Sequence, residues 1–558
     1  MPADQNAHHP ISRMTLFENI LQARGLDAAS IADFLSPDYD TKHDPFLLPD
    51  MHAAVDRLVQ ALDNQEHIMI YGDYDIDGLT ATTVLLDAFA SFGFLHVDSF
   101  IPNRFIEGYG LTIDAVEQII EAGAQLIVTV DCGSLSHKEI ERSNALGVDV
   151  IVTDHHNVSD MQPPAVAVIN PKRSDHGYPF IDLAGVGVAF KLVQALQTRI
   201  DGLPNGSEKW LLDLVALGTV CDVVTLVDEN RTNVYWGLKV LAKTRRPGLR
   251  ALMAVAKVDP PTVNSRSLGF GLGPRMNAAG RLETARHSLD MLLATDGRVA
   301  LEKAEQLDMM NLARRSDQDK IFKAAIIQAE RYRDLPVLVV SGADWNHGIV
   351  GIVAAKLLEK YKKPTYVLQE MGEQSKGSAR SYGDFSAVAA IRAADDIITK
   401  GGGHTLAAGV TLPTANIAAF RTRVNQFYTD LQLRDQPALL LPKADVVIDD
   451  LSEVTEGLID QLASLEPFGS ANPEPILQIK NVIVTDQRRM GADNQHVKLE
   501  VKDGQGRRMQ VLAFGAPSHF YAEPGESVSV MFQPSINEWQ GRRTVEGRLL
   551  HLEMSDVS

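Results

Sequence analysis

The chain has 558 residues, of which 45% are hydrophobic and 22% charged, and its formal net charge is −19. This length is too great for one hydrophobic core and predicts about three or four domains. The excess of acidic residues argues against broad, non-specific binding of nucleic acid. It does not exclude an enzyme of nucleic acids, because cations bound to acidic side chains reverse the local charge.

The cellular compartment is indicated by the cysteines and by the N-terminus. Only two cysteines occur, Cys132 and Cys221, so no disulfide framework is expected and a reducing compartment is favoured. The segment from Met1 to Arg13 is polar and lacks the apolar core of a signal peptide. No apolar stretch is long enough to cross a bilayer. We therefore expect a cytoplasmic protein without a membrane partner.

The first part of the chain predicts an α/β domain. After a lead-in of short helices and loops over residues 1–45, strand and helix patterns alternate from Ile68 to about Ile200. This alternation is typical of a doubly wound parallel sheet. The expected helices cover residues 78–91, 113–122, 135–146 and 187–200. We therefore assign residues 46–250 to one α/β domain.

The rest of the chain predicts a connector and two further domains. Residues 251–334 are expected to form the connector, with a glycine-rich segment at 265–281 and one long helix of mixed charge from residue 298 to 334. A helix that is polar on much of its face usually bridges domains. A second, smaller α/β domain is predicted over residues 335–443. About five short strands predict a small barrel of the OB type over residues 444–558.

Three apolar runs in the first third of the chain each end in acidic residues. The first run is followed by Asp73, Asp75 and Asp77, the second by Asp131, and the third by Asp154-His155-His156. Because ligands bind at the carboxyl ends of parallel strands, these side chains are expected to converge. Carboxylates that crowd together repel one another and raise each other's pKa. Divalent cations would remove this repulsion.

Each of these motifs has an ordinary explanation when it is taken alone. The segment Asp73–Gly78 resembles a calcium-binding loop, but it has neither the required glutamate nor a preceding helix. Asp131 could cap a helix, and the two histidines could belong to a turn. Asp222 ends another apolar run, where an unpaired acid would be costly and a cation or an arginine partner is expected.

Together the motifs predict a site for two divalent cations. Neutral imidazole suits Mn²⁺ or Zn²⁺, carboxylate suits Mg²⁺ or Mn²⁺, and paired ions in such sites lie about 3.5–4 Å apart. The expected metal ligands are Asp73, Asp75, Asp77, Asp131, His155 and Asp222. Of the two histidines, one is expected to bind metal while the other, His156, faces a phosphate group of the substrate.

Residues in the second α/β domain are candidates for phosphate binding. Arg380 lies between Ser378 and Ser381 and could hold a phosphate through two hydrogen bonds, although a surface ion pair is the alternative. The run Gly401-Gly402-Gly403-His404 offers backbone N–H groups for an anion, whereas a plain turn is the alternative. His347 precedes a helix, and phosphate contact and helix capping are equally compatible with its position.

Basic residues elsewhere could follow the backbone of a nucleic-acid strand. Arg275, Asn277 and Arg281 lie in the glycine-rich part of the connector, where the alternative is a hinge that packs domains together. In the C-terminal domain, basic pairs alternate with aromatic residues, a combination that suits single strands because bases stack and phosphates pair with cations. These residues are Arg488-Arg489, Arg507-Arg508, Arg542-Arg543, Phe514, Phe532 and Trp539.

The order of these motifs resembles the DHH phosphoesterase superfamily. Three further segments are similar to the RecJ family of single-strand-specific DNA exonucleases within it, and the likeness extends from about Phe46 onward. These segments are Pro274 to Arg281, Gly401 to Gly409, and Pro467-Phe468-Gly469 followed by Asn472-Pro473-Glu474-Pro475.

The resemblance implies a fold, a reaction and a set of site residues. The fold would comprise a DHH domain, a DHH-associated domain and an OB-like domain, and the reaction would be 5′-to-3′ hydrolysis of single-stranded DNA to nucleotides with Mn²⁺ or Mg²⁺. Such an enzyme would act in DNA recombination and repair, with single-strand-binding protein and a helicase as further partners. Asp73 would be a metal ligand or would support one. The residues at the reacting phosphate would be Asp154, His156, Arg380 and His404.

Two other functions share part of this pattern. A phosphodiesterase for small substrates would have the same metal ligands, but it would need neither the arginine-bearing connector nor the C-terminal domain. A strand-binding protein without activity would be expected to have lost metal ligands, whereas every expected acid is present.

Overall fold

The computed structural model describes residues 14–27, 30–433, 437–491, 494–516 and 520–555. Residue contacts divide the chain into two units. One unit comprises residues 39–440 and 469–471, and the other comprises residues 1–38, 441–468 and 472–558. The polar N-terminal segment that we examined for a signal peptide, residues 1–13, lies outside the described ranges. Among the described helices, none combines the length and hydropathy needed to span a membrane.

The predicted doubly wound sheet is confirmed. Its strands are β1 (Ile68–Gly72), β2 (Val97–Phe100), β3 (Leu126–Val130), β4 (Asp149–Thr153) and β5 (Ala167–Ile169). All pairings are parallel, and the strand order is β2-β1-β3-β4-β5. The chain places β2 on one side of β1 and then crosses over to place β3 on the other side, so the strand order reverses between β1 and β3. Ligands of such sheets bind at this switch point.

Helices cover both faces of this sheet. They pack through two clusters of buried apolar side chains, one on each face. The helices of this domain are α3 (Met51–Asp63), α4 (Ile76–Phe92), α5 (Ile113–Glu121), α6 (His137–Ala145), α7 (Gly185–Leu196), α8 (Leu212–Cys221), α9 (Asp228–Leu241) and α10 (Pro247–Ala256).

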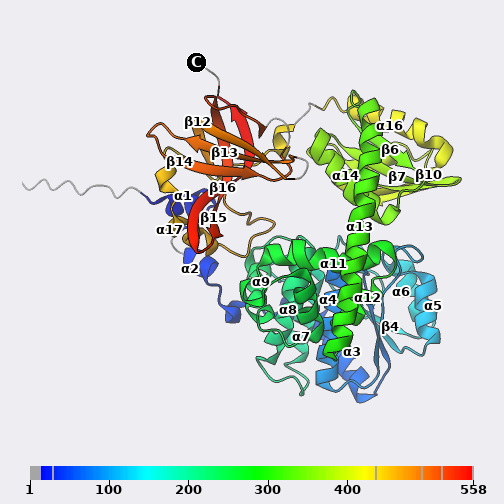
Figure 1. The fold of residues 1–558 in the computed structure, drawn as a ribbon. Coiled ribbons are helices and arrows are strands. Elements are labelled where there is room, and N and C mark those ends of the chain that lie inside the picture. The colour runs from blue at the N-terminus through cyan, green and yellow to red at the C-terminus, as the bar shows by residue number, and fades with distance from the viewer. Residues whose placement is uncertain (1–13, 28–29, 434–436, 492–493, 517–519, 556–558) are drawn as a thin grey trace, which may run out of the picture. The chain divides into compact units, whose positions relative to one another are not determined.

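The glycine-rich part of the connector is helical. A π-helical turn, η5 (Ser267–Leu272), leads into α11 (Gly273–Leu282) and α12 (Arg286–Leu292). A Cβ atom on Gly273 would lie 2.8 Å from Sγ of Cys221, so glycine serves close helix packing here. The predicted long helix is confirmed as α13 (Gly297–Arg331), which runs from these helices to the second α/β domain (Figure 1).

The second α/β domain is a mixed five-stranded sheet. Its order is β6-β7-β8-β10-β9, with only β6 and β7 parallel. The run Gly401–Gly403 was expected to be a loop, but it forms part of the edge strand β9 because it pairs with β10. The elements are β6 (Leu338–Gly342), α14 (His347–Tyr361), β7 (Thr365–Met371), β8 (Gln374–Arg380), α15 (Ala387–Arg392), β9 (Lys400–Gly403), β10 (Ala407–Pro413) and α16 (Ile417–Asp430).

The other unit contains the predicted barrel. Its strands follow the order β11-β12-β13-β14-β16-β15, and an additional pairing of β12 with β15 closes the ring. This closure agrees with an OB-like barrel. The elements are β11 (Val446–Ile448), α17 (Glu456–Ala463), β12 (Leu477–Met490), β13 (His496–Lys502), β14 (Arg508–Ala513), β15 (Ser527–Trp539) and β16 (Arg542–Met554).

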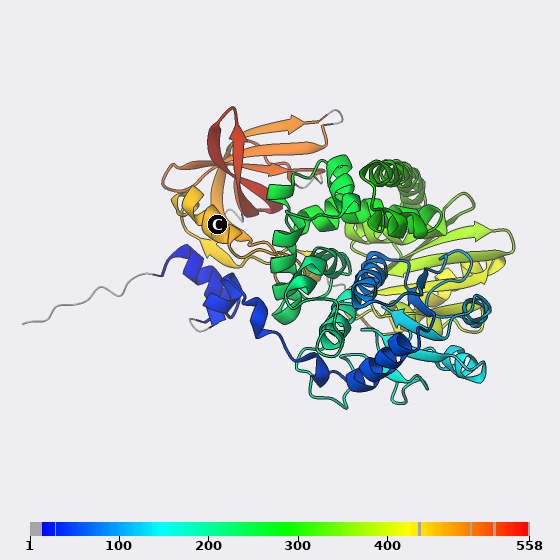
Figure 2. The same ribbon diagram turned by 90° about the horizontal axis from the view of Figure 1, so that it is seen from below.

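The N-terminal lead-in packs on this barrel unit. Helix α1 (Leu16–Ala23) contributes buried side chains to the same core as the barrel strands, and α2 (Ser30–Leu35) follows it. The Arg24 side chain bonds Asp445 at 2.8 Å and donates to Asn472 at 2.9 Å. In both ribbon views the blue N-terminal helices lie beside the first elements of the C-terminal part of this unit, near α17 (Figures 1 and 2). The two ends of the chain therefore build one unit together.

Candidate metal centre

The acidic residues lie where the parallel strands end. Asp73 follows β1, Asp131 follows β3 and Asp154 follows β4. Asp75 caps α4, since its Oδ1 accepts hydrogen bonds from the backbone N–H groups of Asp77 at 2.9 Å and Gly78 at 3.2 Å. Strand ends and a helix start thus bring acids from separate parts of the sequence to one edge of the sheet.

The remaining ligand candidates are held by helix ends and by β4. The carboxylate of Asp77 accepts hydrogen bonds from the first N–H groups of α7, at 2.6 Å from Gly185 and 2.8 Å from Val186. These N–H groups and the helix dipole favour the charged form of the carboxylate. Asp222 lies at the C-terminal end of α8, and His155 follows β4.

The described residues contain three groups of possible metal ligands. One group joins Asp131 to His155 and His156, and the other two form a pair of triads. One triad is Asp77, His155 and Asp222, and the other is Asp73, Asp75 and Asp131, with ligand atoms within 4.8 Å of one another in each. Asp131 connects the triads, because its Oδ1 lies 3.1 Å from Nε2 of His155. Two neighbouring triads, with the Asp131 carboxylate of one close to the His155 ring of the other, are suited to two cations.

The electrostatics of the site fit divalent cations. Burial, followed by repulsion from neighbouring carboxylates, raises the pKa of Asp73 to about 8, that of Asp77 to about 7 and that of Asp222 to about 9. The same causes raise the pKa of Asp131 well above its usual range. These carboxylates lack counter-charge, and two divalent cations would supply it.

Unpaired polar atoms in the same place also fit a metal. Within the described part of the chain, Asp73 Oδ1, Asp131 Oδ1 and His155 Nε2 are buried and make no hydrogen bond. Burial, together with the neighbouring His156, lowers the pKa of His155 to about 3, which keeps its imidazole neutral and able to bind a metal. Oxygen ligands with one imidazole suit Mn²⁺ or Mg²⁺.

Asp154 and His156 lie beside the two triads. His156 Nδ1 donates to Asp154 Oδ1 at 2.8 Å, and Asp154 also accepts hydrogen bonds from the N–H groups of Ser134, His155 and His156. Although burial opposes it, the hydrogen bond to Asp154 raises the pKa of His156 above its usual range. The structure therefore places Asp154 behind His156, where it orients the ring and favours its protonated form.

The backbone is strained at two points of the site. Asp131 has φ 61° and Val223, which follows Asp222, has φ 64°. A β-branched residue rarely adopts this left-handed conformation, and such strain is usually found at functional sites. Both strained residues are a metal-ligand candidate or its direct neighbour.

Arginines form a second cluster in the same unit. Burial and the charges of Arg104, Arg314 and Arg380 lower the pKa of Arg281 to about 10, while the nearby Asp75 opposes this shift. Arg281 also donates a hydrogen bond at 3.1 Å to the carbonyl oxygen of Gly348, at the start of α14. The guanidinium groups repel one another, so an anion such as phosphate would stabilise the cluster.

Several predicted substrate residues lie beside this arginine cluster. Gly351 of α14 faces Arg380 and Ser378, because a Cβ atom placed there would lie 3.4 Å from both side chains. The N–H and Nδ1 of His347 donate to the Gln369 side chain, while its Nε2 is buried and makes no hydrogen bond to any described residue.

Other predicted residues are placed differently. Ser381 is buried and donates to the carbonyl of Phe385, and Arg275 is held by Asp308 at 2.7 Å and by the carbonyl of Gly271. Asn277 is half-buried on α11, whereas His404 is exposed at the end of β9. Gly402 and Gly403 are exposed residues of that edge strand.

Three residues near the site were missed by the sequence analysis. Arg104 lies over the ring of Tyr74 at 4.3 Å, and the ring of Tyr109 lies 5.7 Å from that of His156. Both follow the end of β2, so the strand-end rule that found the acids could have found them. Arg314, bonded to Asn311 and Gln318 on α13, left no signal in a long polar helix.

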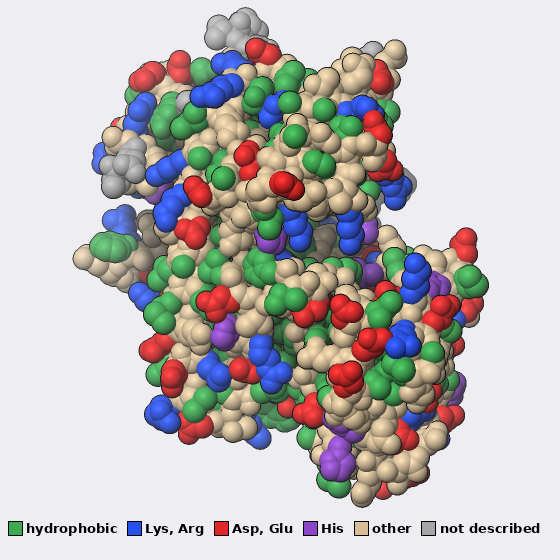
Figure 3. Space-filling view, turned by 90° about the vertical axis from the view of Figure 1, so that its right-hand side faces the viewer, with side chains coloured by type: hydrophobic (Ala, Val, Ile, Leu, Met, Phe, Trp, Pro, Cys, Tyr) green, Lys and Arg blue, Asp and Glu red, His purple; other side chains and the backbone are tan. Residues whose placement is uncertain are grey.

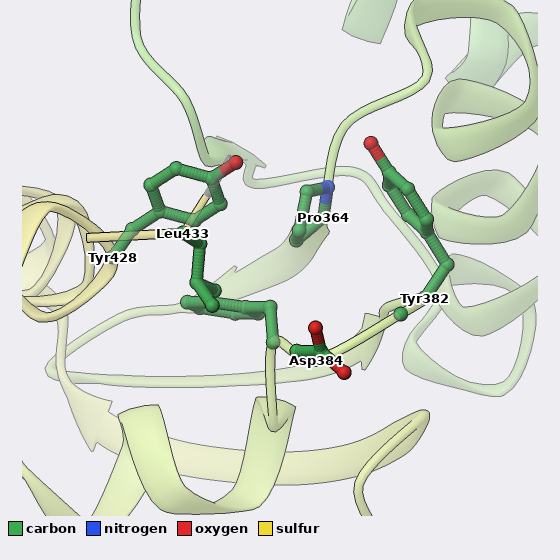
Figure 4. A pocket seen from close by; sticks show the side chains of 7 residues that line it. Pro364, Tyr382, Asp384, Tyr428 and Leu433 are labelled. Carbon is green, nitrogen blue, oxygen red and sulfur yellow. The ribbon is translucent and has the colours of Figure 1, made fainter. Parts of the chain in front are cut away.

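The surface of this region is hollowed. A hollow crosses the middle of the face drawn in Figure 3, and Lys, Arg and His side chains lie along it. A separate pocket in the second α/β domain is lined by Pro364, Tyr382, Asp384, Phe385 and Tyr428 (Figure 4). Its volume of about 20 Å³ is enough for one water molecule, which excludes a nucleotide there.

The barrel unit exposes two of its predicted aromatic residues. Trp539, at the end of β15, is 71% exposed and pairs across the hairpin with Arg542, and Phe514 is 65% exposed. Phe532 is buried in the barrel core and cannot stack on a base. Arg508 and Arg543 form ion pairs with acids of the same unit.

Three known family models match separate parts of the chain. The DHH family N-terminal domain matches residues 67–219, the DHHA1 domain matches residues 334–430, and the RecJ OB domain matches residues 445–551. The fold and the acidic centre thus define a metal-dependent phosphoesterase of the DHH family.

Individual relatives narrow this class. The chain is 36% identical to the single-stranded-DNA-specific exonuclease RecJ of Escherichia coli, covering 89% of each protein, and 33% identical to that of Haemophilus influenzae, covering 99% of this chain and 97% of the relative. It is 38% identical to the Bacillus subtilis exonuclease, of which it spans 66%. The crystal structure of Thermus thermophilus RecJ with Mn²⁺ superposes with a TM-score of 0.83 at 29% identity, covering 97% of this chain and 76% of that one. The chain therefore belongs to the RecJ family.

Proposed function

We propose that this protein hydrolyses single-stranded DNA from the 5′ end with two divalent cations, Mn²⁺ or Mg²⁺, and releases nucleotides. The observation that carries this proposal is the pair of acidic triads with an arginine cluster beside it. Cations would neutralise the carboxylates of the triads, and phosphate groups would neutralise the guanidinium groups of the arginine cluster.

The residues around the triads have distinct roles in this reaction. When bound, the two cations would activate water and stabilise the charge that develops on the phosphate oxygens. Asp77 and Asp222 would hold one ion with His155, and Asp73 and Asp75 would hold the other with Asp131. Protonated His156, oriented by Asp154, would donate a hydrogen bond to a non-bridging oxygen of the reacting phosphate.

The arginines would bind the strand and place its end. Arg281 and Arg380 each carry a planar guanidinium group that can bond two oxygens of one phosphate. Ser378 and Arg104 would add donors on either side. His404 and the edge strand β9 are exposed and would contact the DNA at a greater distance from the reacting phosphate.

The barrel unit would bind a more distant part of the strand. Exposed aromatic side chains stack on bases regardless of sequence, and basic residues bind the phosphates. Trp539 with Arg542, and Phe514, offer such surfaces. This would favour single strands, whose bases are free to stack.

The cellular role follows from the family and the substrate. We place the protein in DNA recombination and repair in the cytoplasm, where its two free thiols would persist. Single-strand-binding protein and a helicase are the proposed partners. Co-purification of either with the tagged full chain, in the presence of a nuclease that removes DNA bridges, would test this.

Digestion of end-labelled DNA tests the proposed reaction. Single- and double-stranded oligonucleotides and a dinucleotide, labelled at either end, are incubated with the protein in Mn²⁺ or in chelator. We expect mononucleotides released from the 5′ end of the single strand only, and only with metal. Equal cleavage of the duplex, release from the 3′ end, or cleavage of the dinucleotide alone would contradict the proposal.

A further inference from the structure

The turn between α8 and α9 carries Asp222 and is strained. Val223 has φ 64° and Asp228, at the start of α9, has φ 48°. Both residues adopt the left-handed conformation without being glycine, and such strained conformations persist only where the surroundings enforce them. The position of the Asp222 carboxylate therefore depends on contacts that hold this turn.

One set of contacts ties the turn to the loop before α7. The Thr225 hydroxyl donates to the Asp182 carboxylate at 3.2 Å, and the Asn230 side chain donates to the carbonyl oxygens of Asp182 at 2.6 Å and Thr225 at 3.0 Å. Asp182 lies three residues before Gly185, whose N–H holds Asp77. The supports of two ligands in the same triad are thus connected.

A second contact comes from a segment far away in the sequence. The N–H of Leu226 donates to the carbonyl oxygen of Ser470 at 2.8 Å. Residues 469–471 group with the catalytic unit by their contacts, although the residues on both sides of them belong to the barrel unit. Leu226 itself is 1% exposed.

Gly469 packs directly against Leu226. A Cβ atom on Gly469 would lie 2.6 Å from Cδ1 and 3.2 Å from Cγ of that leucine. Real Cβ atoms do not approach carbon this closely, so a larger residue would force the buried Leu226 side chain to shift. Displacement of Leu226 would pass along four residues of a strained turn to Asp222.

We propose that Gly469 and Ser470 are positioning residues for the metal ligand Asp222, a role that rests on the metal centre of the proposed function. They hold Leu226, Leu226 fixes the turn, and the turn aims the carboxylate at the ion shared with Asp77 and His155. Groups that orient metal ligands commonly change metal affinity about 10- to 100-fold when they are altered.

The substitution Gly469→Ala tests this role without DNA. Isothermal titration of the purified full chain with Mn²⁺ should show binding about 10-fold weaker than in the unsubstituted protein. Gly504→Ala is the matched control, because a Cβ atom at Gly504 meets no atom within 4 Å and should leave Mn²⁺ binding unchanged. Circular dichroism and thermal unfolding of both variants confirm that they are folded.

A second substitution separates positioning from general damage. Leu226→Ala removes the atoms that the new Cβ would meet, so the double variant should bind Mn²⁺ more tightly than Gly469→Ala alone. In DNA digestion, excess Mn²⁺ should restore kcat of Gly469→Ala, with KM for the strand unchanged. If Gly469→Ala fails to fold, Leu226→Ala alone gives the same readout, with a smaller loss of Mn²⁺ affinity.

Three outcomes would overturn the proposal. The first is that Gly469→Ala binds Mn²⁺ as tightly as the control variant. The second is that the double variant binds Mn²⁺ no more tightly than Gly469→Ala. The third is that Gly469→Ala binds single-stranded DNA more weakly in chelator but binds Mn²⁺ normally. The last result would indicate that Gly469 and Ser470 contact DNA instead. Because Mn²⁺ is titrated without substrate, failure of the unsubstituted protein to digest DNA would refute the nuclease function and leave this test intact.

Discussion

The acidic triads and the arginine cluster are both groups of like-charged side chains, but their charges have opposite sign. In the triads, buried carboxylates face one another and their pKa values rise. In the cluster, burial and the charges of neighbouring arginines lower the pKa of Arg281. Neither group has enough counter-charge from the described protein residues around it, so each is built for a ligand of the opposite sign. We therefore propose the triads for cation binding and the arginine cluster for phosphate binding.

Removing the charge of Asp131, which connects the two triads, should cause the largest loss of cleavage. Asp131→Asn keeps the shape of the side chain but removes its charge, so cleavage should fall about 10³-fold or more in a Mn²⁺ digestion assay. Strand affinity in chelator should be retained, because the arginines are unaltered. Asp98→Asn, at an exposed carboxylate, serves as control. Near-normal turnover of Asp131→Asn would refute the metal assignment.

Removing a charge from the arginine side should weaken strand binding instead. For Arg281→Gln we expect about 10-fold weaker binding of single-stranded DNA and a salt dependence reduced by about one phosphate contact, measured by fluorescence anisotropy over a series of salt concentrations. Arg275→Gln should have less effect, because Asp308 already pairs with that arginine. An unchanged salt dependence for Arg281→Gln would remove it from the strand path.

The barrel unit is expected to bind single-stranded DNA without taking part in its cleavage. Trp539→Ala should weaken binding of long single strands by about 5-fold or more, because stacking on one base contributes about 1–3 kcal/mol. Digestion of strands too short to reach the barrel should be unaffected. Phe532→Leu, at a buried position, is the comparison variant and should leave strand affinity unchanged if the barrel stays folded. Equal effects of Trp539→Ala on short and long strands would contradict this division.

The raised pKa values predict a smaller effect on stability. Asp73, Asp77 and Asp222 keep protons in the folded protein up to about pH 7–9, whereas unfolded aspartates lose them near pH 4. Without metal, these groups therefore make the protein less stable as pH rises through that window. Mn²⁺ replaces the protons, so its increase in Tm should be larger at about pH 8.5 than at about pH 6. Calorimetry that shows the reverse order would contradict the assignment.

Much of the acidic site could be predicted from sequence because its residues follow one rule. Asp73, Asp131 and Asp154 each end an apolar strand, and parallel strands end at the same edge. The same local reasoning gave the long helix and the closed barrel, since apolar periodicity and strand spacing are properties of short segments.

The arginine side was harder to predict because its partners come from separate elements. Arg275 and Arg281 share one glycine-rich segment, yet Arg275 is paired with α13 and only Arg281 faces other arginines. Which neighbour a side chain meets depends on helix packing. The glycines of that segment gave no prediction of helix, whereas Gly273 allows close packing within a helical stretch.

Mn²⁺ located by anomalous scattering in crystals of the full chain tests the central claim most directly. We expect two peaks about 3.5–4 Å apart, one among Asp77, His155 and Asp222 and the other among Asp73, Asp75 and Asp131. A single peak, or peaks out of reach of Asp131, would contradict the two-cation centre on which the function depends.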